Sequence, residues 1–231
     1  MLSYRKLAMR VLGRPLHTGG GIDSPRPASQ RAAAFILTAA MLTTLAAPAF
    51  AGTWDIENGD ITISAGETGN DVTQNNETTY GDTGTVITGK SDKNTVTIEA
   101  KDEGDKVEVK FENVNIDASS RSEAAVSVTG KGDTNIELDG DNELKGAHNR
   151  AGLEHNQTVD GEGNVTSGKL TIQDENNDGR LNATGKGFAA GIGGGSVKAG
   201  QVTITGGTIT ATGEDGAGIG GGHGNMGSNA G

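Results

Sequence analysis

The sequence predicts an all-β protein, a parallel β-helix with three short strands in each turn. Residues Gln201–Gly222 read QVTITGGTITATGEDGAGIGGG. They divide into three segments of alternating β-branched or small residues: Val202–Thr205, Thr208–Thr212 and Ala217–Gly220. Each segment ends in glycines or an acidic turn, which is typical of strands and leaves no room for a helix between them. Because one such turn cannot bury its inward residues alone, several turns must stack on one another.

The same three segments recur upstream, at spacings that change together. The spacings are 29, 34 and 32 residues for the first strand, 28, 37 and 28 for the second, and 27, 39 and 27 for the third. The marker residues are Val107, Ile136, Leu170 and Val202, then Ile116, Leu144, Leu181 and Ile209, then Val126, Leu153, Ile192 and Ile219. All three series lengthen at the same turn, which predicts insertions at residues 157–168 and 174–179. We expect the third series to stack inward in one row.

A low-complexity Gly/Thr/Asp linker is the alternative interpretation, but compositional bias alone does not move three series together. The chain has 231 residues, 32% hydrophobic and 3% aromatic, which is lean for a conventional globular core. A β-helix tolerates such a composition because small aliphatic side chains fill its narrow core. No cysteine is present, so disulfides cannot contribute to its stability.

The charge of the chain excludes some partners. The formal net charge is −11, and residues 52–231 carry 13 basic against 29 acidic residues, a net charge of −16. Such a surface repels nucleic acid and anionic membranes and favours cations and neutral partners. Solubility alone is the simpler explanation of most of these acidic side chains.

Residues 1–51 have the features of a signal peptide with a long basic N-region. A basic stretch precedes the apolar run Ala32–Pro48, which is followed by Ala49-Phe50-Ala51. Cleavage after Ala51 is the natural interpretation, and it predicts a secreted or cell-surface protein. A retained membrane anchor is the alternative, because the apolar run is only just long enough to span a bilayer. No segment after Ala51 is apolar enough to insert into a membrane.

The rest of the chain divides into two regions. Residues 52–105 are expected to form the first coil and a cap, with Trp54, the only tryptophan, covering the open end. Residues 106–231 carry the repetitive coils. No capping element follows them, which suggests a truncated gene or a fragment of a longer surface protein.

These segments carry a resemblance to a known family. They are Trp54–Ile63, Val114–Ser119, Ile136–Gly146, Ala151–Leu153 and the paired Ala-Gly-Ile-Gly-Gly-Gly motifs at 190–195 and 217–222. Together they resemble bacterial cell-surface right-handed parallel β-helix proteins described as carbohydrate-binding domain-containing proteins, which are similar to pectate-lyase-type helices. The resemblance covers essentially all residues after 51. It implies a right-handed helix, an exported protein, and binding of plant polysaccharides with calcium; no catalytic residue of the lyases matches here.

One turn carries part of a calcium loop. Asp174, Asn176 and Asp178 supply oxygen at positions 1, 3 and 5, and Gly179 stands at position 6. Position 12 is Gly185, where such a loop needs a bidentate glutamate. The three residues are therefore candidate metal ligands, and an ordinary Asx-type turn between two strands is the alternative.

Other candidate sites are weaker. His148, His155 and His223 are widely spaced, so we expect surface histidines and no zinc site. The Gly-Ile-Gly-Gly-Gly runs precede neither a helix start nor Lys-Ser/Thr, which excludes a phosphate loop. A sugar site would be polar and shallow because aromatic residues are few. Such a face would include Thr203, Thr205, Thr210 and Thr212, which could also bind ice.

Three function classes follow. The first is a non-catalytic module that binds polysaccharide or a host or plant glycan and acts like an adhesin. The second is a polysaccharide lyase-like enzyme, which would need a basic residue beside paired acids on one face; Lys169 and Arg180 flank the acidic turn. The third is a structural spacer. The sequence assigns no catalytic residues and does not indicate the oligomeric state.

Overall fold

Strands follow one another through most of the computed structural model, which describes residues 51–224. The N-terminal strands are β1 (Thr53–Asp55), β2 (Ile61–Ala65), β3 (Asn70–Gln74), β4 (Glu77–Asp82), β5 (Val86–Ser91) and β6 (Val96–Ala100). The remainder are β7 (Lys106–Asp117), β8 (Val126–Gly130), β9 (Asp133–Asp139), β10 (Asp141–His148), β11 (Leu153–Glu154), β12 (Lys169–Gln173), β13 (Arg180–Lys186), β14 (Ile192–Gly193), β15 (Gln201–Ile204), β16 (Thr208–Thr212) and β17 (Ile219–Gly220). Two 3₁₀ turns, η1 (Ile56–Asn58) and η2 (Ala118–Ser120), complete the elements. None of the helical segments in this range is long and apolar enough to span a membrane.

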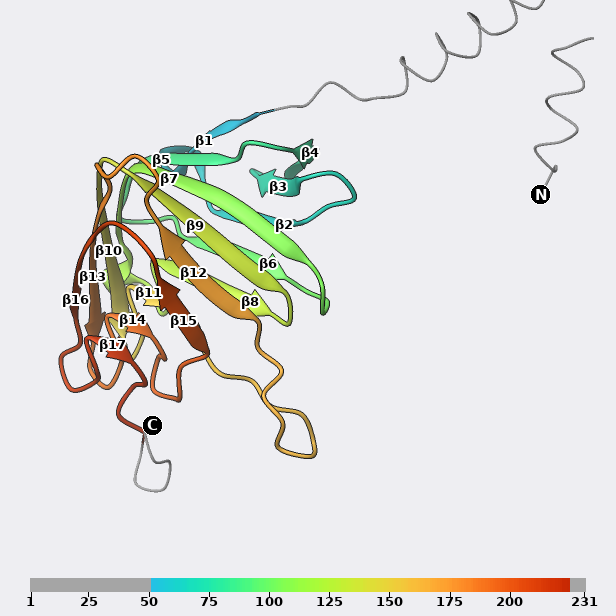
Figure 1. Ribbon diagram of the computed structural model, residues 1–231. Helices are drawn as coiled ribbons and strands as arrows, with labels where there is room; N and C mark the ends of the chain where they lie inside the picture. Colours follow the sequence, from blue (N-terminus) through green and yellow to red (C-terminus); the bar gives the residue numbers. More distant parts are fainter. Residues whose placement is uncertain (1–50, 225–231) are drawn as a thin grey trace, which may run out of the picture. The chain divides into compact units, whose positions relative to one another are not determined.

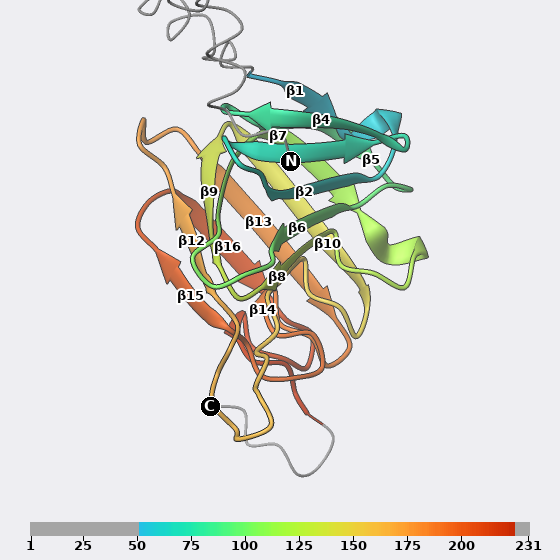
Figure 2. The ribbon, with the colours of Figure 1, turned by 90° about the vertical axis from the view of Figure 1, so that its right-hand side faces the viewer.

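From β7 onward the chain winds as a parallel β-helix with three strands per turn (Figures 1 and 2), as the repeat predicts. The first row of stacked strands is β7, β9, β12 and β15, and the second row is β7, β10, β13 and β16. The third row contains β8, β11, β14 and β17. All strand pairs within these rows are parallel, and β7 is long enough to belong to the first two rows. The first turn therefore fuses two of the predicted strands into one.

Residues of the third row stack as the spacing predicts. Val126, Leu153, Ile192 and Ile219 pair in direct register. The first three are fully buried, whereas Ile219 is 48% exposed because no further turn covers it within residues 51–224. Its position in the row is confirmed, but its expected burial is wrong.

The predicted register of the other two rows is wrong by two residues, on both sides of β9 in the first row and between β10 and β13 in the second. Leu170 pairs with Thr134, and Ile136 pairs with Ile172. In the second row Leu144 pairs with Ala183 instead of Leu181. Side chains alternate with a period of two, so this shift preserves the buried face and leaves the fold class unchanged. The residues that stand at the expected inward positions are polar, Thr134 in the first row and Asn142 in the second, and both are buried.

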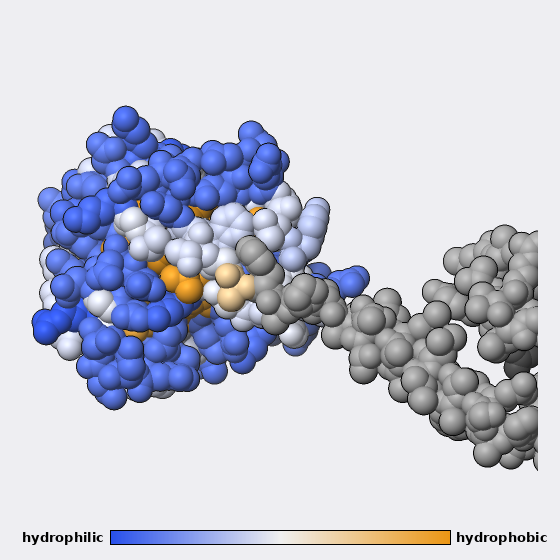
Figure 3. All heavy atoms as spheres, turned by 90° about the horizontal axis from the view of Figure 1, so that it is seen from above, coloured by the Kyte–Doolittle hydropathy of each residue, from blue (hydrophilic) through white to orange (hydrophobic). Residues whose placement is uncertain are grey.

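The N-terminal turns contain two strands each, β1 with β2 and β5 with β6. β2 and β6 extend the third row, and β5 pairs with β7 and β1. An antiparallel hairpin of β3 and β4 then covers the edge of β2. The face seen from above, on the side of β1 and β5, is mostly hydrophilic (Figure 3).

Buried polar groups close this end. Asp82 is 1% exposed and accepts hydrogen bonds from the backbone of Gly52 (3.0 Å), from the backbone of Gly84 (3.1 Å) and from Nε1 of Trp54 (2.8 Å). The Asn70 amide donates to the Glu108 carbonyl (2.7 Å) at the free edge of β7. Among the described residues no earlier first-row strand pairs with β7 at this edge. Residues 1–50 and 225–231, which include the predicted signal segment, lie outside the described residues.

Candidate functional site

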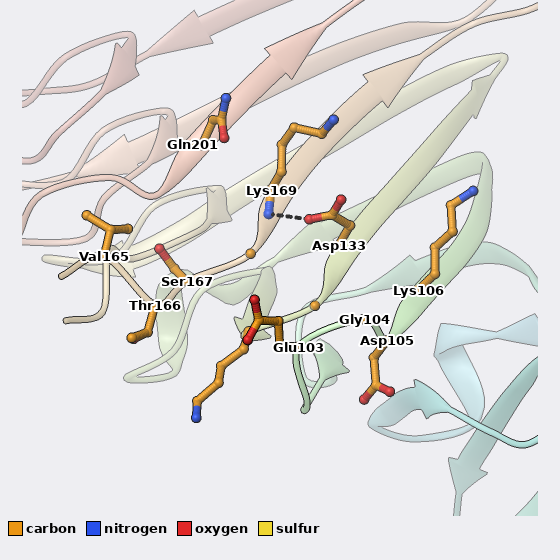
Figure 4. Close-up of a pocket in the computed structure, with 13 residues that line it drawn as sticks. Glu103, Gly104, Asp105, Lys106, Asp133, Val165, Thr166, Ser167, Lys169 and Gln201 are labelled. Atoms are coloured by element: carbon orange, nitrogen blue, oxygen red, sulfur yellow. Dashed lines mark hydrogen bonds between the residues drawn. The ribbon is translucent and has the colours of Figure 1, made fainter. Parts of the chain in front are cut away.

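A groove of about 710 Å³ lies across the beginnings of the first-row strands. Lys106, Asp133, Lys169 and Gln201 are the opening residues of β7, β9, β12 and β15. Its walls are these four residues together with Lys131 and the turns at 103–105 and 165–168. We call this site the lysine groove, after Lys106, Lys131 and Lys169. Figure 4 shows Lys106, Asp133 and Lys169 in succession across neighbouring strands. Thr166 and Ser167 lie on the side of Lys169 that is away from Lys106.

The alternation of each strand places these side chains on the outer surface. Val107, Thr134, Leu170 and Val202 follow the four opening residues and point inward, so their predecessors point outward. Lys106 pairs with Asp133, Lys169 pairs with Gln201, and the backbone N–H of Lys169 donates to Oδ1 of Asp133 (2.9 Å). One cation, one anion, a second cation and an amide therefore lie in order along the helix axis.

The predicted insertion at 157–168 forms one wall of the lysine groove. β11 and β12 are separated by residues 155–168, whereas β8 and β9 are separated only by Lys131 and Gly132. The insertion returns to the helix at Gly168, which has no space for a side chain because a Cβ there would lie 1.7 Å from the Gly132 carbonyl oxygen. This close approach seats the wall against the turn that carries Lys131.

His155 anchors the insertion and is not the surface histidine that the sequence predicts. It is 2% exposed, its Nε2 lies 2.9 Å from the Gly168 carbonyl oxygen, and its Nδ1 lies 3.3 Å from that of Val128. His155 stands two residues after Leu153 and so continues an inward column of the third row below Val128. Alternation from Leu153 was the signal that could have placed it. His148 and His223 are exposed, as expected.

The lysines of the groove differ in their partners. Lys106 Nζ lies 2.5 Å from Glu108, and this hydrogen bond raises the pKa of Lys106 above its ordinary value. Lys131 and Lys169 make no ion pair with any described residue. Asp133 accepts the Lys169 amide, and Asp105 accepts the Asp102 amide (2.9 Å). Two unpaired ammonium groups thus remain available on a strongly acidic protein.

The candidate calcium ligands lie elsewhere, in the turn between β12 and β13. Asp174 is buried, and its Oδ1 and Oδ2 accept the backbone N–H groups of Asn177 (2.9 Å) and Gly179 (3.1 Å). Asn176 and Asp178 are exposed. Within residues 51–224 no three His, Cys, Asp or Glu side chains form a cluster that could hold a metal ion. The Asp174 contacts are those of an Asx-type turn, and calcium at this turn remains a prediction.

The expected threonine face is wrong, because the four residues lie on two different rows. Thr203 stands in β15 beside Thr171, while Thr210 and Thr212 stand in β16 beside Asn182 and Thr184. The two strands are at opposite edges of their sheet. Thr205 follows β15, and its Oγ1 donates to the Ile172 carbonyl (3.3 Å).

The two basic residues beside the acidic turn also separate. Lys169 lines the lysine groove, whereas Arg180 begins β13 and lies 3.5 Å from Asp141 of β10. They therefore do not flank a common pair of acids. The sequence analysis missed the other groove residues, although all of them either open a first-row strand or lie in the turn before it.

Comparison with known protein families supports the fold. Residues 177–196 and 202–223 match the family model for the beta helix repeat. The first stretch contains β13 and β14, and the second contains β16, β17 and most of β15. No curated protein and no solved structure matches the chain significantly. The match supports the β-helix fold of the chain.

Proposed function

We propose that this chain is a secreted or cell-surface, non-catalytic module that binds an acidic polysaccharide in the lysine groove. The observation that carries the proposal is that Lys131 and Lys169 line one groove and make no ion pair with a described residue, in a protein whose net charge is −11. Carboxylates or sulfates of a polymer would complete these two positions, whereas most of the surrounding surface repels anions.

The shape of the lysine groove favours a polymer over a small metabolite. Small-molecule pockets are mostly apolar and enclosed. This groove spans the beginnings of four stacked strands and has a polar lining without aromatic side chains. Each contact is weak at such an exposed site, so affinity must come from several contacts along one chain.

The acids of the groove favour a binding role. Asp133 and Asp105 each accept a backbone N–H group and so shape the turns. An enzyme of the lyase type would need a free base beside the substrate, and Glu103 alone among the three groove carboxylates makes no hydrogen bond to a described residue and could serve as one. Release of unsaturated sugar ends, measured as ultraviolet absorbance on polygalacturonate, would contradict the non-catalytic part of the proposal.

Affinity electrophoresis in gels containing polygalacturonate tests the binding part. We expect the protein to be retarded, and the double variant Lys131→Gln/Lys169→Gln to lose most of that retardation. The matched control is Lys93→Gln/Lys198→Gln, which removes the same charge from exposed lysines outside the groove. Retardation should weaken as ionic strength rises, because the Debye length falls from about 30 Å at 0.01 M to about 8 Å at 0.15 M salt. Equal loss in both double variants would mean a nonspecific charge effect.

A further inference from the structure

A second groove of about 560 Å³ lies on the second row and shares only β7, by its other end, with the lysine groove. Its floor is one line of outward side chains contributed by successive strands. In order along the helix axis they are Lys90, Asn115, Glu143, Asn182 and Thr210, each paired in register with the next. We call it the amide groove, after Asn115 and Asn182.

The charged side chains of the amide groove are paired within the protein except Lys90, which makes no ion pair with any described residue. Glu143 accepts from the Asn115 amide (3.1 Å) and lies 2.8 Å from Lys145 Nζ. The hydrogen bond between Lys145 and Glu143 raises the pKa of Lys145 above its ordinary value. At the rim, Asp141 lies 3.5 Å from Arg180. Asp141, Glu143 and Arg180 are therefore compensated, which leaves Lys90, at one end of the floor, as the unpaired charge of this groove.

Apart from Lys90, the groups that remain free are neutral and able to form hydrogen bonds. Asn182, Thr208 and Thr210 are exposed, and their side chains make no hydrogen bond to any described residue. An amide donates and accepts, as a hydroxyl does, so these groups suit a ligand rich in hydroxyls. Glu143 is held by Asn115 and Lys145 and keeps acceptor capacity for a further hydroxyl.

We propose that the amide groove is a second binding site, for an uncharged polysaccharide whose chain runs along the helix axis with about one sugar per turn. Neighbouring strands lie roughly 4.8 Å apart, so the groove repeats its polar groups at that interval. An extended chain of hexoses repeats at a similar distance and can meet one turn with each sugar. The domain would then bridge two chemically different polymers on two faces.

The site should depend on polymer length. Without an aromatic platform each sugar contributes little, and useful affinity requires several turns to be engaged at once. We therefore expect retardation by a polymer and little competition from mono- or disaccharides at the same sugar concentration.

Affinity electrophoresis with hydroxyethylcellulose, a soluble neutral glucan, and with a neutral mannan tests the proposal. We expect retardation by at least one of them, unchanged between low and high salt. The variant Asn182→Val/Thr210→Val keeps residues that favour strands and should weaken this retardation at least tenfold while leaving binding to polygalacturonate intact. Lys131→Gln/Lys169→Gln should do the reverse. Thermal unfolding of each variant checks that the fold persists.

Three outcomes would overturn the second site: no retardation by either neutral polymer, full retardation of the Asn182→Val/Thr210→Val variant, or loss of neutral binding in the lysine variant. The last would mean one shared site. Failure with polygalacturonate alone would remove the function proposed for the lysine groove and leave the amide groove standing.

Discussion

The two ends of the helix are built differently. At the N-terminal end the β3–β4 hairpin continues the sheet of the third row, and Asp82, the last residue of β4, accepts hydrogen bonds from three donors. At the other end β15, β16 and β17 are the last described strands, and Ile204 and Ile219 are 37% and 48% exposed. Ile192, one turn earlier in the same row as Ile219, is fully buried. In a solenoid the burial of a residue thus depends on the neighbouring turn as much as on the residue itself.

The largest expected effect tests this dependence directly. Ile192→Asp should cost about 3–5 kcal/mol of unfolding free energy, because it places an unpaired charge in the core. Ile219→Asp, the same change one turn later, should cost no more than about 1 kcal/mol because the new carboxylate reaches water. Thermal unfolding measures both, at about 2–4 °C for each kcal/mol in a domain of this size. Similar losses would show that the last turn is covered in solution.

The polar closure of the N-terminal end should also be asymmetric. Asp82→Ala leaves two backbone N–H groups and the Trp54 indole without their acceptor, and should cost about 3 kcal/mol. Glu214→Ala is the matched change in the last turn, where the carboxylate accepts one hydrogen bond from the described residues, the Gly187 N–H (2.7 Å); it should cost about 1 kcal/mol. Denaturant unfolding compares the two. Equal costs would contradict a cap that acts at one end.

The candidate calcium ligands belong to the C-terminal half, because Asp174, Asn176 and Asp178 lie between β12 and β13. If they bind it, calcium at a hundredfold excess over its dissociation constant stabilises the fold by about 2.7 kcal/mol. Asp178→Ala should abolish that gain and leave calcium-free stability nearly unchanged, because its side chain makes no hydrogen bond to a described residue. Asp174→Ala should destabilise the protein even without calcium, since it opens the turn. An unchanged melting temperature across a calcium titration would mean that these residues form an ordinary Asx-type turn and bind no calcium.

The fold class could be predicted from the sequence because the third row preserves an apolar residue at every turn. The registers of the first and second rows could not, since Thr134 and Asn142 are polar at inward positions and the nearest apolar residue lies two places away. Such substitutions leave the alternation intact, so only the strand pairing reveals them.

The two grooves could not be predicted from the sequence for a different reason. Lys106, Lys131 and Lys169 are far apart in the chain and meet only because strand openings align across turns. An exact register is needed to see that alignment, and the insertion at 157–168 obscures it. The N-terminal hairpin was hidden as well, because residues 70–84 are polar and their strands, β3 and β4, bury few apolar side chains.

The two polar residues that concealed the register differ in how they are satisfied, and this gives the smallest expected effect. Asn142 Oδ1 accepts the Val114 N–H (2.9 Å), and its Nδ2 donates to the Asp139 and Arg180 carbonyls (3.1 Å each). Thr134 is fully buried between Val107 and Leu170, and its Oγ1 has no hydrogen-bond partner among the described residues. A buried hydroxyl without a partner costs free energy that an isosteric methyl group does not.

Thr134→Val should therefore raise the unfolding free energy by about 1 kcal/mol, because it removes the unsatisfied hydroxyl and keeps the volume. Thr171→Val is the matched control: the residue is in the next strand of the same row but points outward, so its effect should stay within about 0.5 kcal/mol. Asn142→Leu should lower the unfolding free energy, because it leaves the Val114 N–H without an acceptor and the Asp139 and Arg180 carbonyls without a donor. The stabilisation by Thr134→Val is measured as an increase in the melting temperature of the full chain. A loss of stability in Thr134→Val would mean that the Thr134 hydroxyl finds a partner in solution, and that the first row is closed more completely than its strand pairing indicates.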